Sequence, residues 1–108
     1  MYVVTYYQDK ENSEPSVFSD KLSACKRCAE LITKAAYVYG VIDELYRPFI
    51  DSIEDYTDYP ELKCDIDNIF KTNENAYPVK NGWGWALQCP NGSEIVVQMF
   101  DRQGEEIL

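Results

Sequence analysis

The stretch of sequence that decides the fold is SDKLSACKRCAELITKAA, at residues 19–36. Projected at about 100° per residue, its apolar side chains gather on one half and its charged and hydroxyl side chains on the other. The apolar half holds Leu22, Cys25, Cys28, Ala29, Leu31, Ile32, Ala35 and Ala36. The polar half holds Ser23, Lys26, Arg27, Glu30, Thr33 and Lys34. Because Ser19-Asp20 also supplies N-cap chemistry, the sequence predicts one long amphipathic helix that covers a core.

Segments rich in β-branched and aromatic residues predict three strands, at residues 2–7, 83–89 and 94–100. Asn91-Gly92 lies between the last two strands. This dipeptide is typical of a type I′ hairpin turn, in which both central residues need a positive φ. We therefore expect a C-terminal hairpin.

The polar stretches between these elements, residues 8–16 and 72–82, predict loops. Beyond the hairpin, residues 101–108 are expected to hold a second turn, at Gln103-Gly104, and a short edge strand.

The stretch 37–43 admits two interpretations. Its composition favours a strand. Helical spacing is also present from there onward, at Val41, Leu45, Phe49 and Ile53. Because Pro48 would damage a helix that ran through it, we predict a strand over 37–43 and a short helix that opens near Pro48.

A third helix is predicted over residues 61–71, directly after Pro60. Leu62, Ile66, Ile69 and Phe70 line one face of it at helical spacing. The first half alone would also suit an alternating strand, but the length of the segment favours a helix.

Together these elements predict an α+β fold in the order β-α-β-α-α-β-β. About four strands form a single-layer sheet packed on the one long helix, and two short acidic helices complete the chain. If the first two strands are neighbours, they run parallel and a right-handed crossover joins them. With 108 residues, the chain suffices for one core, so residues 1–108 are expected to form a single acidic domain.

The charge balance restricts what the protein can bind. Ten Lys and Arg oppose 19 Asp and Glu, so the net charge is −9, and there is no His. This charge argues against direct binding of nucleic acid or of an anionic membrane. The N-terminus lacks the features of a signal peptide and no apolar run approaches membrane-spanning length, so a cytoplasmic protein with reduced cysteines is expected.

The Cys25-Lys26-Arg27-Cys28 stretch is a C-x-x-C pattern. Together with Cys64 and Cys89 it could form a four-thiolate zinc site, and alone it could form a redox pair. Both thiols nevertheless fall within the apolar half of the predicted helix, so we expect them to be small buried side chains.

Glu61-Leu62-Lys63 matches part of a Mg²⁺-dependent nuclease pattern, with Asp43 or Asp51 as a further carboxylate. A nuclease must approach a polyanion, which a charge of −9 repels. Since the chain also lacks His, the commonest general base, and a phosphate-cradling glycine loop, we expect neither an enzyme nor a bound cofactor.

Acidic residues are concentrated in the middle of the chain. Residues 43–76 hold ten acids and three bases, a net charge of −7. This segment is either a solvated acidic face or a docking face for a basic partner, steered by long-range attraction. The residues expected to bind that partner are Asp43, Glu44, Asp51, Glu54, Asp55, Asp58, Tyr59, Glu61, Asp65 and Asp67. Within a continuous helix, four of them would share a face within roughly 100°, namely Asp51, Glu54, Asp55 and Asp58.

The sequence thus predicts a non-enzymatic binding protein, most specifically an inhibitor that docks on a basic protein surface. Its carboxylates would occupy Lys and Arg sites that otherwise hold the phosphates of a nucleic acid. Small phage anti-defence proteins and toxin-immunity proteins share this size and acidity, a likeness of composition and not of motif. A monomer or weak homodimer is expected. The alternatives are a metal- or thiol-dependent protein and a structural subunit of a homo-oligomer.

Overall fold

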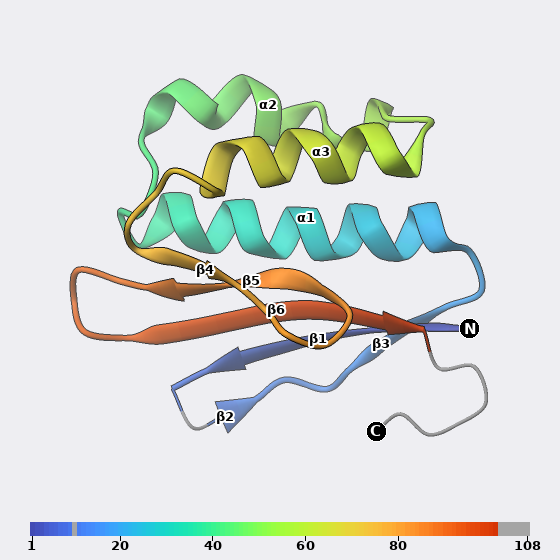
Figure 1. Cartoon of the computed structure of the whole chain (residues 1–108), viewed down its shortest axis with the longest axis horizontal. Helices are drawn as coiled ribbons and strands as arrows, with labels where there is room; N and C mark the ends of the chain where they lie inside the picture. The colour runs from blue at the N-terminus through green and yellow to red at the C-terminus, as the bar shows by residue number, and fades with distance from the viewer. Residues whose placement is uncertain (10, 102–108) are drawn as a thin grey trace.

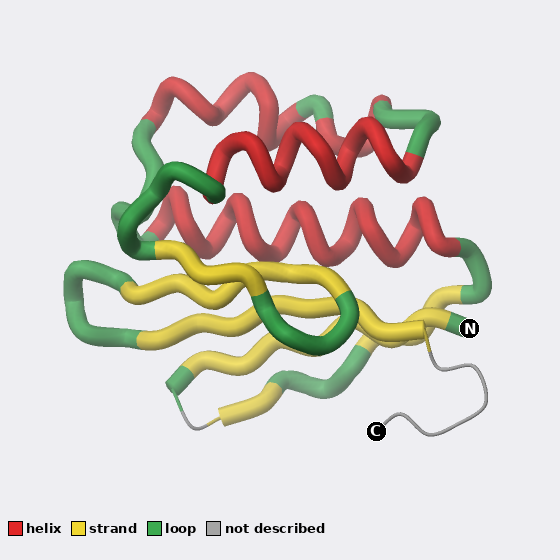
Figure 2. Tube along the Cα trace, in the orientation of Figure 1, coloured by secondary structure: helices red, strands yellow, loops and turns green. Residues whose placement is uncertain are grey.

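The helices of this protein lie on one face of an antiparallel sheet, as the computed structural model shows (Figures 1 and 2). The structure describes residues 1–9 and 11–101. Six strands form the sheet within these residues: β1 (Tyr2–Gln8), β2 (Glu11–Asn12), β3 (Ser16–Phe18), β4 (Ala76–Pro78), β5 (Trp83–Gln88) and β6 (Glu94–Asp101). Their order is β2-β1-β6-β5-β4, and β3 also pairs with β1. The predicted α+β class is confirmed.

The long helix α1 (Lys21–Val38) packs against β1, β5 and β6. Asp20 caps its N-terminus, and the carboxylate accepts the Ser23 backbone N–H at 2.8 Å. Small side chains bring the helix close to its neighbours, and those buried completely include Ala24, Cys25, Cys28, Ala29 and Ala36. Thr33, which the projection placed on the polar half, is also fully buried. Its hydroxyl donates to the Ala29 carbonyl at 2.8 Å, which satisfies the buried polar group.

The other helical elements lie on α1, on the side away from the sheet (Figure 1). They are η1 (Glu44–Tyr46), α2 (Arg47–Asp51), η2 (Ile53–Asp55) and α3 (Tyr59–Phe70). A proline stands in the first turn of both α2 and α3, where its missing N–H leaves no bond unmade. The helix predicted over 61–71 is confirmed as α3, which buries Leu62, Ile66 and Phe70 and leaves Cys64 exposed.

The strand predicted over 37–43 is wrong, because α1 continues to Val38 and a tight C-terminal cap follows. Gly40 has φ +80°, and its N–H bonds to the Tyr37 carbonyl. The Val41 N–H bonds back to the Ala36 carbonyl at 2.7 Å, which completes a Schellman motif. Val41 and the following residue are buried beneath this turn, which explains their apolar character without a strand. All strand pairs among the described residues are antiparallel, and the predicted parallel crossover is absent from them.

The C-terminal hairpin of β5 and β6 is confirmed, but its turn is not type I′. Among the described residues other than glycine, positive φ occurs at Asp9 and not at Asn91, whereas Gly92 has φ +93°. The Gly92 N–H bonds to the Cys89 carbonyl, and the Cys89 N–H bonds to the Ser93 carbonyl, both at 2.9 Å. This is the pattern of a three-residue loop, in which a type I turn precedes a left-handed glycine.

Two short strands, β2 and β4, lie in segments whose polar composition predicted loops, and β3 begins at the last residue of one of them. Each of the three extends an edge of the sheet. Their short lengths leave little periodicity to detect. The turn and edge strand expected after residue 101 lie outside the described residues. The helices of the described chain are too short or too polar to cross a lipid bilayer.

Candidate functional site

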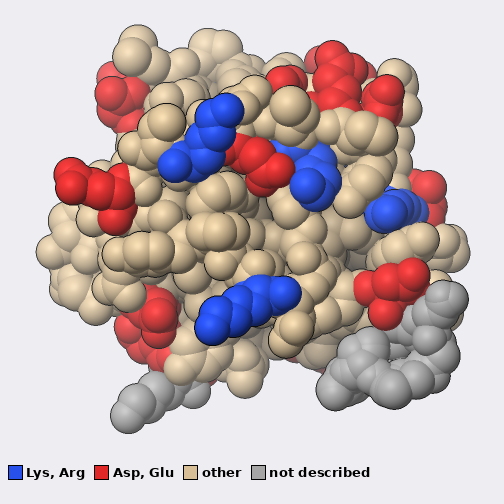
Figure 3. Space-filling view, viewed as in Figure 1, with Lys and Arg blue, Asp and Glu red and all other residues tan. Residues whose placement is uncertain are grey.

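Seven of the ten residues predicted to bind a partner are exposed carboxylates on the helices that lie on the side of α1 away from the sheet. They are Asp43, Glu44, Asp51, Glu54, Asp55, Asp58 and Glu61, and we call this set the acidic surface. They come from η1, α2, η2 and the start of α3, which follow one another along the chain. Figure 3 shows acidic side chains grouped over the chain that leads into α3, at the upper right of the view.

The sequence predicted that Asp51, Glu54, Asp55 and Asp58 share one face of a continuous helix. In the structure they lie on separate elements. Asp51 ends α2, Glu54 and Asp55 lie in η2, and Asp58 caps α3. The capping residue has an extended backbone (φ −131°, ψ 117°), and its carboxylate accepts the Glu61 backbone N–H at 3.4 Å. A continuous helix through Pro60 would bring the proline ring against the carbonyl four residues earlier, so the Asp58 cap and this proline together separate α3 from η2. The carboxylates of α2 and η2 stay on one side of the molecule because a buried isoleucine anchors each of these two elements.

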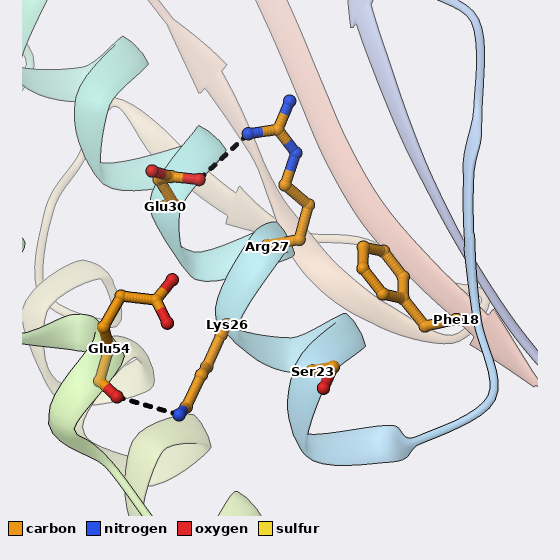
Figure 4. Close-up of a pocket in the computed structure, with 6 residues that line it drawn as sticks. All are labelled: Phe18, Ser23, Lys26, Arg27, Glu30 and Glu54. Carbon is orange, nitrogen blue, oxygen red and sulfur yellow. Dashed lines mark hydrogen bonds and ion pairs between the residues drawn. The ribbon is translucent and has the colours of Figure 1, made fainter.

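These anchors are Ile50 in α2 and Ile53 in η2, which are 8% and 2% exposed. A hydrogen bond adds to them, since the Lys26 ammonium of α1 donates to the Glu54 backbone carbonyl at 2.9 Å (Figure 4). The acidic side chains of α2 and η2 therefore project from backbone that packs on α1.

Little of the negative charge is neutralised within the molecule. Arg47 lies 3.5 Å from Asp51, and both side chains are more than half exposed, so this ion pair is weak. Glu54, Asp55 and Glu61 form no ion pair with any described residue. Their charges are accordingly available to a partner.

An open pocket of about 280 Å³ lies within the acidic surface. Ser52, Asp55, Tyr56, Thr57 and Glu61 line it. The Tyr56 hydroxyl donates to Asp65, and burial together with this bond raises the pKa of the phenol. The pocket thus combines two carboxylates with a neutral aromatic ring, which suits a cationic side chain.

The sequence predicted that Asp67 binds the partner, but its side chain points toward β5. One carboxylate oxygen accepts both the Trp83 and the Trp85 indole N–H, at 2.9 and 3.0 Å. The other oxygen lies 3.3 Å from the Lys63 ammonium. Asp67 therefore ties α3 to β5. Sequence reasoning missed this role, although two tryptophans spaced two apart on a strand signal a need for acceptors on one face.

Asp65 and Tyr59 are likewise half-buried. Asp65 accepts the Tyr56 hydroxyl. Tyr59 packs against the core, and the Lys21 ammonium lies 4.4 Å from the centre of its ring. Much of their bonding capacity is used within the molecule, so they contribute less to the acidic surface than the sequence suggested.

Cys25 and Cys28 are fully buried, which confirms the interpretation of both as small core side chains. Burial raises the pKa of Cys25 to about 12 and the pKa of Cys28 well above its usual value. A redox-active pair needs the opposite shift. Cys64 is exposed and Cys89 is buried. Within the described residues, no three Cys, Asp or Glu side chains are arranged to hold a metal ion, so the four thiols do not form a joint site.

The same finding applies to the nuclease-like pattern. Within the part of the chain that the structure describes, Glu61 belongs to no group of three or more acidic or thiol side chains that could hold a metal ion. Lys63 pairs with Asp67, which in turn holds the two indoles. These contacts give the lysine a structural partner.

A second pocket, of about 250 Å³, lies between α1, β3 and η2 (Figure 4). Its charges are largely balanced, because two basic and two acidic side chains line it and Arg27 lies 2.9 Å from Glu30. This pocket presents no strong field of either sign, so the acidic surface is the better candidate.

No protein-family model, no curated protein and no solved structure matches this chain.

Proposed function

We propose that this protein is a non-enzymatic binding protein that docks on a basic surface of another protein through its acidic surface. The observation that carries the proposal is the set of seven exposed carboxylates, three of which stand on α2 and η2, whose backbone is anchored to α1. A solvated face needs no fixed geometry, whereas a docking face gains affinity when its charges are already in position.

The net charge favours association with a basic protein surface over association with a neutral or acidic one. A protein with a net charge of −9 attracts basic surfaces over a Debye length of about 8 Å at physiological salt. Steering of this kind raises association rates and weakens as salt is added. The expected partner therefore carries clustered Lys and Arg side chains.

Within this surface, the pocket lined by Asp55, Tyr56 and Glu61 is the proposed binding site for one basic side chain of the partner. A Lys or Arg side chain of the partner would place its charge between the two carboxylates and its stem against the ring. In the most specific form of the proposal, those basic side chains normally hold nucleic-acid phosphates, and this protein acts as an inhibitor that excludes them.

Affinity capture with three baits tests the proposal. The first is the parent protein, and the second carries Asp55→Lys with Glu61→Lys. The third carries Glu11→Lys with Glu14→Lys, a matched change of charge at exposed positions in and beside β2. We expect the parent and the control to capture the same basic proteins at low salt and to release them as salt is added. The Asp55/Glu61 variant should not capture these proteins. Equal capture by all three baits would contradict the proposal.

A further inference from the structure

We infer that Asn91, in the turn of the C-terminal hairpin, is a site of deamidation, and that the fold directs this reaction to Asn91 and away from Asn81. Both asparagines are followed by glycine, and all four residues are exposed. Because glycine has no Cβ, its backbone nitrogen is the least obstructed in attacking the preceding side chain. Sequence and exposure do not distinguish the two sites, so the local structure must.

Deamidation of an asparagine that precedes glycine needs only base and water. The glycine N–H loses its proton to hydroxide, and the nitrogen attacks the side-chain Cγ of the asparagine. The new C–N bond closes a succinimide ring, and the side-chain nitrogen leaves as ammonia after it takes up a proton from water. Water then opens the ring at either of its carbonyls. The product is aspartate or isoaspartate, and the protein gains one negative charge.

The hairpin turn brings the two reacting atoms of this site together. The Asn91 Oδ1 atom accepts the Ser93 backbone N–H at 2.9 Å. The ring closed by this hydrogen bond contains both the Cγ of Asn91 and the backbone nitrogen of Gly92, which keeps them close to each other. The same N–H polarises the side-chain carbonyl and stabilises the negative charge that develops on Oδ1 when the nitrogen adds.

The backbone at Gly92 also has room to move. A Cβ placed on this glycine, whose φ is +93°, would meet no atom within 4 Å. Its N–H donates to the Cys89 carbonyl at 2.9 Å, and this bond must break before the nitrogen can react. Exposed turns open locally at a small fraction of the free energy of global unfolding, so the bond slows the reaction without preventing it.

The backbone at Asn81 is held at two points. The Gln98 side-chain amide donates to the Asn81 carbonyl at 3.1 Å. A Cβ placed on Gly82 would lie 2.1 Å from the Met99 carbonyl oxygen, so this backbone packs directly against β6. Closing a succinimide here rotates the peptide that joins Asn81 to Gly82 and disrupts both contacts. The fold therefore protects Asn81 more than Asn91.

The two products differ in their effect on the hairpin. Aspartate keeps a side-chain oxygen that can accept the Ser93 N–H, so the turn survives with one more charge. Isoaspartate routes the chain through the former side chain and adds one atom to the backbone of a three-residue loop, which distorts the turn between β5 and β6. The isoaspartate form should therefore melt at a lower temperature than the aspartate form.

Site-resolved mass spectrometry tests the inference. Folded protein and protein unfolded in urea are incubated in the same mildly alkaline buffer, and fragment ions assign each conversion to its asparagine. In the folded protein, Asn91 should convert at least ~10-fold faster than Asn81. In urea the two rates should be nearly equal, since each asparagine precedes a glycine. By anion exchange, Asn91→Gln should remove most of the acidic species that the folded protein forms, whereas the matched control Asn81→Gln should not.

Three results would overturn the inference. Asn81 could convert as fast as Asn91 in the folded protein, or the difference between the sites could persist unchanged in urea. Alternatively, Asn91 could stay intact in the folded protein while the unfolded sample converts. All three are measured on the parent protein, so the test holds even if the Asn91→Gln variant does not fold. The turn lies at the left end of the sheet in Figure 1, away from the chain that leads into α3, so these results do not bear on the proposed function.

Discussion

Replacing Asp67 by alanine tests whether this residue is structural, as the two indole bonds indicate. The substitution leaves the Trp83 and Trp85 N–H groups without their acceptor. Trp85 is 5% exposed, so water cannot easily replace the lost bond there.

The size of the effect follows from these contacts. Two hydrogen bonds to a charged acceptor contribute about 1.5 kcal/mol each, at the low end of the range because the carboxylate is partly solvated. Alanine is favoured over aspartate within a helix by roughly 0.6 kcal/mol, which offsets part of the loss. We expect a net decrease of about 2 kcal/mol in the free energy of unfolding, or a decrease of roughly 10 °C in Tm.

Asp67→Asn is the matched variant, since its side-chain oxygen can still accept both indole N–H groups. It loses only the charge, so the decrease should be near 1 kcal/mol or less. Urea unfolding followed by tryptophan fluorescence measures both variants. If Asp67→Ala unfolds with the same free energy as the parent, within about 0.5 kcal/mol, the indole bonds do not hold α3 to β5.

Three further predictions concern the core and the turns. Because burial raises the pKa of the Cys25 thiol to about 12, the unfolded chain releases its proton first, so stability should fall as pH rises above 9. Cys25→Ala should flatten this alkaline loss in pH-dependent unfolding, whereas replacing the exposed Cys64 should not. Gly84→Ala should destabilise by more than about 2 kcal/mol in urea unfolding, because the glycine has φ +158° and a Cβ would lie 2.0 Å from the Val97 carbonyl oxygen. Gly92→Val should lower Tm through its φ of +93° alone, since a Cβ there meets no neighbour within 4 Å; an unchanged Tm would mean that the turn adapts.

The long helix was predictable from the sequence because its periodicity and its N-cap agree. The incorrect strand prediction over 37–43 arose because the composition of the segment favours a strand, whereas its glycine signals the end of a helix. Val41 and Ile42 are β-branched and apolar, as in a strand, but Gly40 favours a left-handed helix end. Their burial beneath the cap, and not strand pairing, accounts for their composition. The hairpin was predictable, whereas its loop length depended on hydrogen bonds that the dipeptide alone does not specify.

The candidate site was predictable in charge and only partly in geometry. Counting acids identified the segment, and eight of its ten carboxylates are exposed, seven of them in the acidic surface and the eighth at Glu74. The sequence could not separate these from Asp65 and Asp67, because the hydroxyl and the indoles that hold them come from residues 9 to 18 positions away. Thr33 illustrates the same limit, since its hydroxyl is satisfied by the carbonyl of its own helix and thus tolerates burial.

The most direct test of docking through the acidic surface is the association rate with a captured basic partner. Stopped-flow mixing at low and high ionic strength would compare the parent, the Asp55→Lys/Glu61→Lys variant and the Glu11→Lys/Glu14→Lys control. We expect the parent and the control to associate fast at low salt and slow steeply as salt rises. The Asp55/Glu61 variant should associate at least ~10-fold more slowly, with a flatter salt dependence. If this variant associates as fast as the control and with the same salt dependence, the acidic surface is merely solvated and the partner does not dock on it.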